Sequence, residues 1–346
     1  MRITVLMGGT SAERDVSLAS GLRIAEALRS RGHEVTSLDT ARGVIDAHEE
    51  RSMLAAGVVK TTPPELSSLA DMTRTSLSPS LGTMAAIRHA DVVFLALHGG
   101  QGEDGTLQAL LDMAGATYTG SGHLASALAM DKDLSKHLFR AAGVHTPDWI
   151  MTEASGGGAS VDDVRVTIGF PAIVKPSKQG STVGLTLVRE PVALQSAIAL
   201  AAAYDDEVMI EQFIAGRELS VSVLGETALP VIEIIPKHEI YDYECKYTTG
   251  MAVEEVPARI SPEAAAEVQR QAVAAFRALK LDGYGRIDFR MSAEGSFFCL
   301  EANTLPGMTA LSLLPQSAAA AGLDFSALCE RIVSLALEKA RATGKE

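Results

Sequence analysis

The stretch GRIDFRMSAEGSFFCLEAN, residues 285–303, carries the pattern that decides the fold. Two runs rich in β-branched and aromatic residues flank a short polar segment that contains glycine, which is typical of a β-hairpin. We expect strands at Gly285–Arg290 and Ser296–Ala302, with a turn at Ser292–Gly295. The rest of the chain is interpreted outward from this hairpin.

Polar side chains recur every second residue on both expected strands. Arg286 and Asp288 therefore share one face of the first strand, and Glu301 and Asn303 share one face of the second. If the two faces coincide, a single surface presents two carboxylates, an amide and a guanidinium. Mg²⁺ prefers such oxygen ligands and often bridges carboxylates to a substrate's phosphates. A solvated hairpin face with a salt bridge is the alternative, but the apolar run at 297–300 departs from the regular alternation it requires.

A glycine-rich loop lies upstream of the hairpin. The expected strand Phe170–Lys175 leads into PSKQGSTVG at 176–184, and a second strand follows at Leu185–Val188. Backbone N–H groups and hydroxyls in such a loop can contact phosphates. The loop joins two strands and does not feed a helix, so it is no Walker A motif and is better interpreted as a lid over a nucleotide. An ordinary hairpin loop remains the alternative.

The N-terminal third alternates strands with helices, which favours a parallel sheet with right-handed crossovers. We expect strands at Arg2–Met7, His33–Leu38 and Asp91–Leu97, and a helix at Ser17–Ser30. The start of the chain lacks GxGxxG, which argues against dinucleotide binding. Residues 41–89 are expected to form a loose insertion with one or two helices. Later segments predict further helices and strands, at 130–142, 191–204, 262–279 and 325–342 for helices and 208–213, 219–224 and 232–236 for strands.

Composition bounds the class of protein. The chain has 346 residues, a formal net charge of −13 and 47% hydrophobic residues, which is ordinary for a globular protein of two or three domains. The acidic balance argues against nucleic acid or an anionic membrane as a partner. The three cysteines match no metal pattern and favour a reduced, cytoplasmic setting. We also expect a protein without a membrane anchor.

Eight stretches, in order along nearly the whole chain, resemble the D-alanine–D-alanine ligase family of the ATP-grasp superfamily. So many collinear matches are not expected by chance, although each alone would be weak. The stretches are GGTSAERDVSLASG (8–21), LHGGQGEDGTLQALLDMAGATYTGSG (97–122), MDKDLSK (130–136), IVKPSKQGSTVG (173–184), IEQF (210–213), YDYECKYTTG (241–250), GYGRIDF (283–289) and LEANTLPGMTALSLLP (300–315).

The resemblance implies a multi-domain fold that combines α/β and α+β parts. An N-terminal parallel α/β domain, which binds substrate, spans residues 1–122. A two-part ATP-grasp fold follows: a central subdomain at 123–213 carries the phosphate-covering loop, and a C-terminal subdomain at 214–346 carries metal and substrate residues.

The resemblance also implies an activity. ATP converts one D-alanine to an acyl phosphate, and the amine of a second D-alanine attacks it, giving D-alanyl-D-alanine, ADP and phosphate for peptidoglycan precursor synthesis. D-alanine and ATP are then the partners. The family also implies a pair of Mg²⁺ ions, with Mn²⁺ as a substitute, and allows a homodimer.

Site residues follow from the same resemblance. Those that look like ATP contacts are Lys132, Lys175, Ser181, Glu211, Gln212, Phe213, Ile214, Glu218 and Lys246. Asp288, Glu301 and Asn303 are similar to the family's metal ligands, which agrees with the hairpin argument. The catalytic set resembles Glu13, Ser181, Tyr247, Arg286 and Gly307, with Arg286 and the Gly307 N–H forming an oxyanion site. Substrate contacts match Glu13, His98, Tyr247, Arg286, Ser312 and Leu313.

Departures and alternatives complete the prediction. Gln212 stands where the family frequently has Lys, and the insertion at 41–90 carries no catalytic motif. Tyr247 favours the dipeptide ligase over D-lactate-using relatives. The alternatives are a related ligase that takes D-lactate, D-serine or another amino acid second, and an inactive nucleotide-binding module that regulates a partner. The complete metal-ligand set argues against the inactive module.

Overall fold

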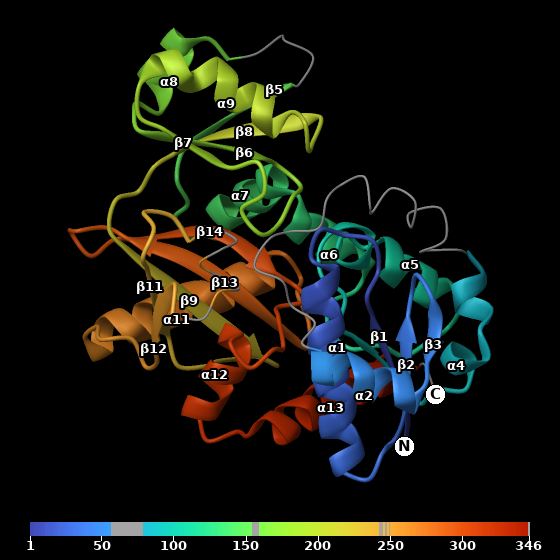
Figure 1. Ribbon diagram of the computed structural model, residues 1–346. Helices are drawn as coiled ribbons and strands as arrows, with labels where there is room; N and C mark the ends of the chain where they lie inside the picture. The colour runs from blue at the N-terminus through green and yellow to red at the C-terminus, as the bar shows by residue number, and fades with distance from the viewer. Residues whose placement is uncertain (57–78, 154–158, 242–244, 246–247, 249, 345–346) are drawn as a thin grey trace.

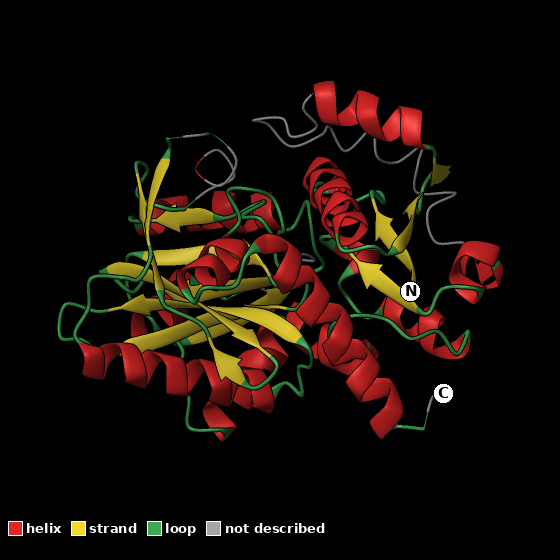
Figure 2. Ribbon diagram, turned by 90° about the horizontal axis from the view of Figure 1, so that it is seen from below, coloured by secondary structure: helices red, strands yellow, loops and turns green. Residues whose placement is uncertain are grey.

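Three β-sheets and the helices around them make up the computed structural model, which describes residues 1–346 except 57–78, 154–158, 242–244, 246–247, 249 and 345–346. The N-terminal part, the central subdomain and the C-terminal sheet surround a common middle region (Figure 1). In Figure 2 the strands form separate groups with helices between and outside them. The multi-domain α/β and α+β architecture predicted from the sequence is confirmed.

The N-terminal sheet has the order β3-β2-β1-β4. Its first strand pairs in parallel with β2 and β4, as predicted, and the short β3 pairs antiparallel with β2. The strands are almost entirely apolar on their inner parts, and their buried residues pack against helices α1 and α5. The elements are β1 (Arg2–Met7), α1 (Arg14–Ser30), β2 (Glu34–Asp39), β3 (Gly43–Ile45), α2 (Ala47–Ala56), η1 (Pro79–Thr83), α4 (Ala85–Arg88), β4 (Val92–Leu95), η2 (Gly100–Gly102) and α5 (Thr106–Met113).

The predicted helix at 130–142 is confirmed with a later start, and the structure adds a helix before it that was not predicted. The structure has α6 (His123–Met130) and α7 (Lys132–Ala141), which are separated at Asp131. Asp131 has extended backbone angles, and its side chain accepts a hydrogen bond from the Leu134 N–H at 3.0 Å. Because an aspartate in this position satisfies an otherwise unpaired N–H, it starts a new helix.

The central subdomain is built on a four-stranded antiparallel sheet in the order β5-β8-β6-β7. Helices α8 and α9 pack on its apolar face. The loop at 177–185 joins neighbouring strands of this sheet, as predicted. The elements are β5 (Trp149–Glu153), α8 (Val161–Thr167), β6 (Ala172–Pro176), β7 (Thr186–Val188), η3 (Pro191–Ala193), α9 (Leu194–Ala201) and β8 (Glu207–Gln212).

The C-terminal sheet contains the hairpin predicted from residues 285–303. Its strands follow the order β12-β11-β9-β13-β14, and β10 pairs with β9. One face packs on α6, α7 and α11, and the other face turns toward the central subdomain and the N-terminal part. The elements are β9 (Arg217–Leu224), β10 (Thr227–Ala228), β11 (Ile232–Pro236), β12 (Ala252–Glu255), α11 (Pro262–Ala278), β13 (Tyr284–Met291), β14 (Phe297–Asn303), α12 (Leu313–Ala320) and α13 (Phe325–Ala342).

The last helix returns to the first part of the chain. In Figure 1, α13 lies beside α1, and its residues Leu328, Cys329, Ile332 and Val333 join the core of the N-terminal sheet. The N-terminal and C-terminal thirds are therefore tied together by shared apolar packing. Within the described residues, no helix is long and apolar enough to cross a membrane.

Candidate active site

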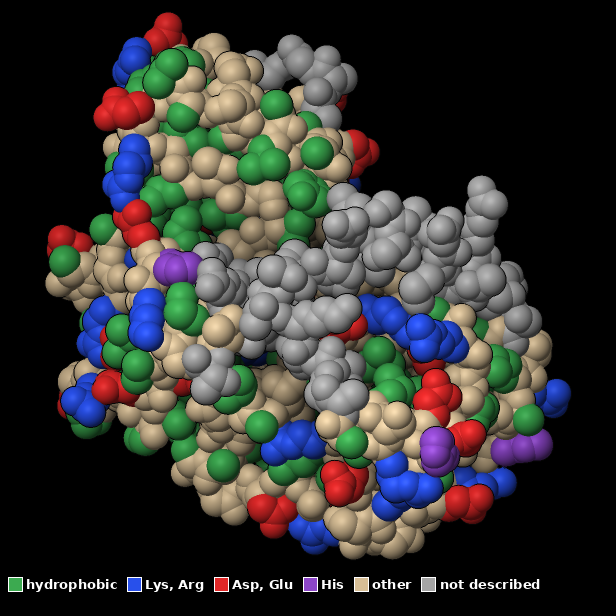
Figure 3. All heavy atoms as spheres, viewed as in Figure 1, with side chains coloured by type: hydrophobic (Ala, Val, Ile, Leu, Met, Phe, Trp, Pro, Cys, Tyr) green, Lys and Arg blue, Asp and Glu red, His purple; other side chains and the backbone are tan. Residues whose placement is uncertain are grey.

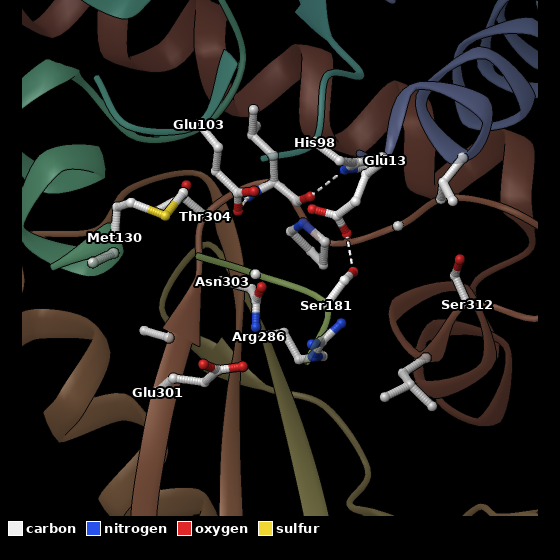
Figure 4. A pocket seen from close by; sticks show the side chains of 18 of the residues that line it. Glu13, His98, Glu103, Met130, Ser181, Arg286, Glu301, Asn303, Thr304 and Ser312 are labelled. Atoms are coloured by element: carbon white, nitrogen blue, oxygen red, sulfur yellow. Dashed lines mark hydrogen bonds between the residues drawn. The ribbon is translucent and has the colours of Figure 1, made fainter. Parts of the chain in front are cut away.

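A continuous hollow lies where the N-terminal part, the central subdomain and the C-terminal sheet meet. It has two adjoining parts that share Lys132, Gly180, Ser181, Tyr241 and Glu301. Figure 4 shows the part that faces the N-terminal domain, which is also lined by Glu13, His98, Glu103, Arg286, Asn303, Gly307, Ser312 and Leu313. The other part runs beneath the 177–185 loop and is also lined by Lys175, Glu211, Gln212, Phe213, Ile214 and Glu218.

The hairpin presents its polar face to this hollow, as the sequence predicts. Asp288 lies opposite Glu301 in the strand register, and Arg286 lies opposite Asn303. Arg286, Glu301 and Asn303 project into the same space (Figure 4). The two pairs of side chains therefore do share one surface.

A β-bulge makes this arrangement possible. Asp288 pairs with Glu301 but its neighbour Phe289 pairs with Cys299, so Leu300 is an extra residue in β14. Leu300 and Glu301 both line the hollow, whereas Cys299 and Ala302 pack in the core on the opposite face. Without the bulge, strict alternation would put Glu301 on the same face as Cys299.

The Asp288 carboxylate is held from three directions. Ser220 donates a hydrogen bond to it at 2.7 Å, the Arg286 guanidinium contacts both of its oxygens at 2.8–3.2 Å, and the Asn303 amide lies at 3.3 Å. Burial alone would lower the pKa of Arg286, but the neighbouring Asp288 raises it above its ordinary value. Arg286 therefore stays charged at the floor of the hollow.

The hairpin donors are suited to a hard divalent cation. Asp288 and Glu301 contribute carboxylates from facing positions. The Asn303 amide lies beside them and also carries a neutral oxygen, although its Nδ2 is the atom that donates to Asp288 here. Each carboxylate contacts a cationic side chain: Asp288 lies 2.8 Å from Arg286, and Glu301 lies 3.4 Å from Lys132. Among the described residues, no cluster of three or more His, Cys, Asp and Glu side chains could hold a metal, at the hairpin or elsewhere.

The 177–185 loop is closed onto the N-terminal domain. Ser181 donates a short hydrogen bond to Glu13, and the dashed line in Figure 4 marks this contact. Thr182 donates to the carbonyl of Tyr241 at 3.1 Å, and both loop residues have positive φ angles, 51° and 63°. Tyr247, the expected third partner of Glu13 and Ser181, lies outside the described residues, as does Lys246.

Beneath the loop, Glu211 sits between two lysines. Its carboxylate oxygens lie 2.8 Å from the Lys175 Nζ and 2.7 Å from the Lys136 Nζ. Burial alone would raise the pKa of Glu211, but the two lysines offset it and hold the pKa below its usual value. Lys136 is fully buried, and that burial lowers its pKa to about 8.

The other residues predicted to contact ATP line the hollow beneath the 177–185 loop, except Lys246, which lies outside the described residues. Lys132 starts α7, and its Nζ donates to the Gln179 carbonyl at 2.7 Å, directly below the loop. Glu218 on β9 pairs with Arg290 at 3.1 Å, and the Arg290 guanidinium lies over the Phe213 ring. The predicted ATP contacts within the described residues therefore line one continuous cleft.

The end of the hollow that faces the N-terminal part is lined by the segment after β14. Ser312 accepts a hydrogen bond from the Thr309 N–H at 3.0 Å, and a Cβ on Gly307 would lie 2.7 Å from the Ser312 hydroxyl. Glycine at 307 therefore allows a close approach of the backbone to Ser312. Both ring nitrogens of His98 contact protein atoms, Ser20 Oγ at 3.1 Å and the Leu305 carbonyl at 2.8 Å.

Sequence reasoning missed two buried charged residues in this site. Lys136 follows Lys132 by four residues, and that one-turn spacing on a helix was a signal that the two lysines share a face. Glu103 lies in the quoted stretch at 97–122, but its contacts with the Leu305 N–H come from a segment 202 residues away. No local pattern could reveal that contact.

Family comparisons agree with the whole-chain pattern. The family model for the D-ala D-ala ligase N-terminus matches residues 2–121, and the one for its C-terminus matches residues 138–334. A D-alanine–D-alanine ligase from Geobacter sulfurreducens is 40% identical over 344 residues, covering 99% of this chain and 96% of that protein. The one from Aquifex aeolicus is 39% identical, covering 96% of this chain and all of that protein (100%).

Solved structures show the same similarity. The VanG D-Ala:D-Ser ligase from Enterococcus faecalis has a TM-score of 0.79 and 29% identity, and covers 97% of this chain and 99% of that one. The D-alanine–D-alanine ligase from Bacillus anthracis complexed with ATP has a TM-score of 0.74 and 31% identity, and covers 99% of each chain.

Proposed function

The chain belongs to the D-alanine–D-alanine ligase family, and on that premise we propose how its residues carry out the ligation. The protein joins two D-alanines to D-alanyl-D-alanine at the expense of ATP, the step that supplies this dipeptide for peptidoglycan. The observation that carries the assignment of roles is the single hollow in which hairpin oxygens and α7 and β6 lysines face each other. A different second substrate is not favoured, since full-length relatives at about 40% identity carry the D-alanine–D-alanine ligase name.

ATP is proposed to lie between the central sheet and the hairpin. Phe213 and Leu300 offer apolar surface for the adenine, next to the backbone of Gln212 and Ile214 at the end of β8. Glu218 lies at the same end of the cleft and is assigned to the ribose hydroxyls. Lys132 and Lys175 lie toward the 177–185 loop, where ammonium groups can offset phosphate charge. Lys246 keeps its predicted role at the terminal phosphate.

Asp288, Glu301 and Asn303 are proposed to hold Mg²⁺. A bound Mg²⁺ neutralises charge on the phosphates during phosphoryl transfer. The donor types and their common face suit this ion. A pair of ions per site, and Mn²⁺ as a substitute, remain predictions.

The D-alanines are proposed to occupy the part of the hollow toward the N-terminal domain. Glu13 borders the amine of the first D-alanine, and Ser181 of the 177–185 loop donates a hydrogen bond to the Glu13 carboxylate. Ser312 and Leu313 at the start of α12 cradle the carboxylate of the second D-alanine. His98 and Tyr247 keep their predicted places beside the first D-alanine.

Arg286 and the Gly307 N–H are proposed to stabilise the oxyanion that forms when the second amine attacks the acyl phosphate. Preorganised donors aimed at developing charge in a water-poor site are usually the largest single source of rate enhancement in enzymes. Arg286 suits this role because Asp288 keeps it charged and oriented. The closed 177–185 loop excludes water that would otherwise hydrolyse the acyl phosphate.

Product identification tests the proposal. Incubation with ATP, Mg²⁺ and D-alanine should give equimolar ADP, phosphate and D-alanyl-D-alanine, and D-lactate or D-serine should compete poorly as second substrate. Asn303→Ala should remove most activity, and full activity in that variant would overturn the metal assignment. A preference for D-lactate over D-alanine would overturn the choice of second substrate.

Light scattering of the purified chain tests the predicted homodimer.

A further inference from the structure

The segment Thr304–Thr309, here the 304–309 loop, is held by side chains of the N-terminal domain. At its start, the Leu305 carbonyl accepts a hydrogen bond from His98 Nδ1 at 2.8 Å, and the Leu305 N–H donates to Glu103 Oε1 at 3.2 Å. Figure 4 shows the His98 contact as a dashed line, with Glu103 beside it. Both polar groups of this residue's backbone are thus bonded to residues more than two hundred positions earlier in the chain.

The other end of the loop is held in the same way by helix α1. The Met308 N–H donates to Ser20 Oγ at 3.1 Å, and the Met308 carbonyl accepts from Arg23 Nη1 at 3.1 Å. Arg23 is itself oriented, since its guanidinium stacks on the Phe325 ring at 3.6 Å. Two residues of one helix turn therefore grip both polar groups of Met308.

The donors and acceptors of these hydrogen bonds can be assigned consistently. Met308 N–H can only donate, so Ser20 Oγ accepts there and has its own hydrogen left for His98 Nε2. Leu305 carbonyl can only accept, so His98 Nδ1 must donate. In this arrangement the His98 imidazole is neutral, with its hydrogen on Nδ1. Burial lowers the pKa of His98 and so favours the neutral form; the charge of Arg286 also lowers this pKa, whereas the charge of Glu13 raises it.

Only Pro306 and Gly307 lie between Leu305 and Met308, the two residues whose backbones are hydrogen-bonded to the N-terminal domain. The proline ring fixes its own φ angle, so few backbone torsions remain free between the anchors. The direction of the Gly307 N–H is consequently set by the positions of Leu305 and Met308. That N–H is the donor assigned above to the oxyanion.

We propose that Ser20, Arg23, His98 and Glu103 are positioning residues that aim the Gly307 N–H and the Ser312 region at the reacting centre. This inference rests on the proposed function, since it concerns the site of the second D-alanine. The N-terminal domain then acts on both reactants: through Glu13 at the first D-alanine, and through this clamp at the second. Small misplacements of such a donor lower the rate by about a hundredfold in other enzymes.

Ser20→Ala is the sharpest test, because α1 offers a matched control. Ser17 lies one turn earlier and is equally buried, accepting from the Gly8 N–H at 2.8 Å and donating to the Ala96 carbonyl at 2.7 Å. Its hydroxyl makes no hydrogen bond to the 304–309 loop among the contacts of the described residues. Ser17→Ala thus removes the same atom and the same kinds of bond without touching the clamp.

Two readouts decide between positioning and plain structural damage. In Ser20→Ala, the Met308 amide should exchange its hydrogen about three- to tenfold faster, the worth of one internal hydrogen bond. The variant should also release more ADP than dipeptide and show a higher KM for the second D-alanine, with the KM for ATP within about twofold of wild type. Ser17→Ala should keep wild-type Met308 exchange and equimolar products.

Matching behaviour of Ser20→Ala and Ser17→Ala in both readouts would overturn the proposal. If Ser20→Ala does not fold, Arg23→Gln takes its place. This variant removes the bond to the Met308 carbonyl and leaves the Met308 N–H bonded, so the same excess of ADP and the same rise in the KM for the second D-alanine are expected of it. The exchange measurement needs no catalysis, so it tests the clamp even if wild-type enzyme makes no dipeptide. That last outcome would instead contradict the proposed function.

Discussion

Two carboxylates, one at each end of the hollow, are buried away from water but have different partners: one contacts lysines and the other contacts backbone N–H groups. Glu211 on β8 is 3% exposed and lies between the ammonium groups of Lys175 and Lys136. Glu103 follows η2, is 8% exposed, and accepts instead from the backbone N–H groups of Gly99 at 3.0 Å and Leu305 at 3.2 Å. The pKa of Glu211 lies below its usual value, whereas burial and the nearby Glu13 raise the pKa of Glu103 to about 7.

The difference shows that partners, and not burial alone, decide whether a buried carboxylate stays ionised. Full positive charges outweigh the cost of removing Glu211 from water, but two peptide dipoles do not outweigh it for Glu103. The end of the hollow proposed to bind the nucleotide thus keeps a permanent ion cluster. The end proposed to bind the amino acids holds a carboxyl group with a raised pKa, which accepts a hydrogen bond from the 304–309 loop.

The largest expected effect is on the ion cluster. Glu211→Gln leaves two lysines facing each other in a buried setting, so the free energy of unfolding should fall by about 3–5 kcal/mol, the cost of breaking a buried ion pair from one side. Urea unfolding at neutral pH measures it. Glu338→Gln, which removes an exposed partner of Arg331, is the control and should cost under about 1 kcal/mol. Equal losses in the two variants would show that the buried cluster is not special.

A second comparison separates the two lysines of the cluster. Lys175 lines the nucleotide cleft, whereas Lys136 is fully buried and also donates to Thr146 at 2.6 Å. Lys175→Met should therefore raise the KM for ATP by about 10- to 100-fold, the worth of a charged hydrogen bond. Lys136→Met should mainly lower the free energy of unfolding, by about 1–3 kcal/mol. Steady-state kinetics and urea unfolding of both variants check this, and a larger KM effect from Lys136→Met would reverse the assignment.

The smallest expected effect is the pH dependence contributed by Glu103. Its folded pKa, about 7, lies above the ordinary value of 4.5, so the folded state binds more protons than the unfolded state between these values. This contribution therefore favours folding at low pH and is lost as the pH rises through 7. The stability of wild type relative to Glu103→Gln, which cannot titrate, should fall by on the order of 2 kcal/mol from pH 5 to pH 8.

Urea unfolding of both proteins at the two pH values measures that difference. Any general effect of pH on the fold cancels between wild type and variant. A difference that stays flat or grows with pH would mean that Glu103 is ionised throughout, like Glu211, and the contrast between the two carboxylates would disappear.

Much of the fold and of the site was predictable because it is written in local patterns. The hairpin strands agree with the prediction within a residue, since alternation and a glycine turn are properties of neighbouring residues. The parallel N-terminal strands were predictable for the same reason. The helix expected at 130–142 starts at Lys132, because Asp131 caps it, and the separate helix α6 before that cap was not predicted.

By itself, the sequence determined the family, the reaction and the residue types that serve it, because these depend on motifs and their order. Tertiary structure alone decided which atoms meet. The bulge at Leu300 turns Glu301 toward the cleft, and the clamp joins Ser20 to Met308 across 288 positions of chain. Such contacts arise from how strands pair and domains pack, and a hydrogen bond over that separation leaves no local periodicity to read.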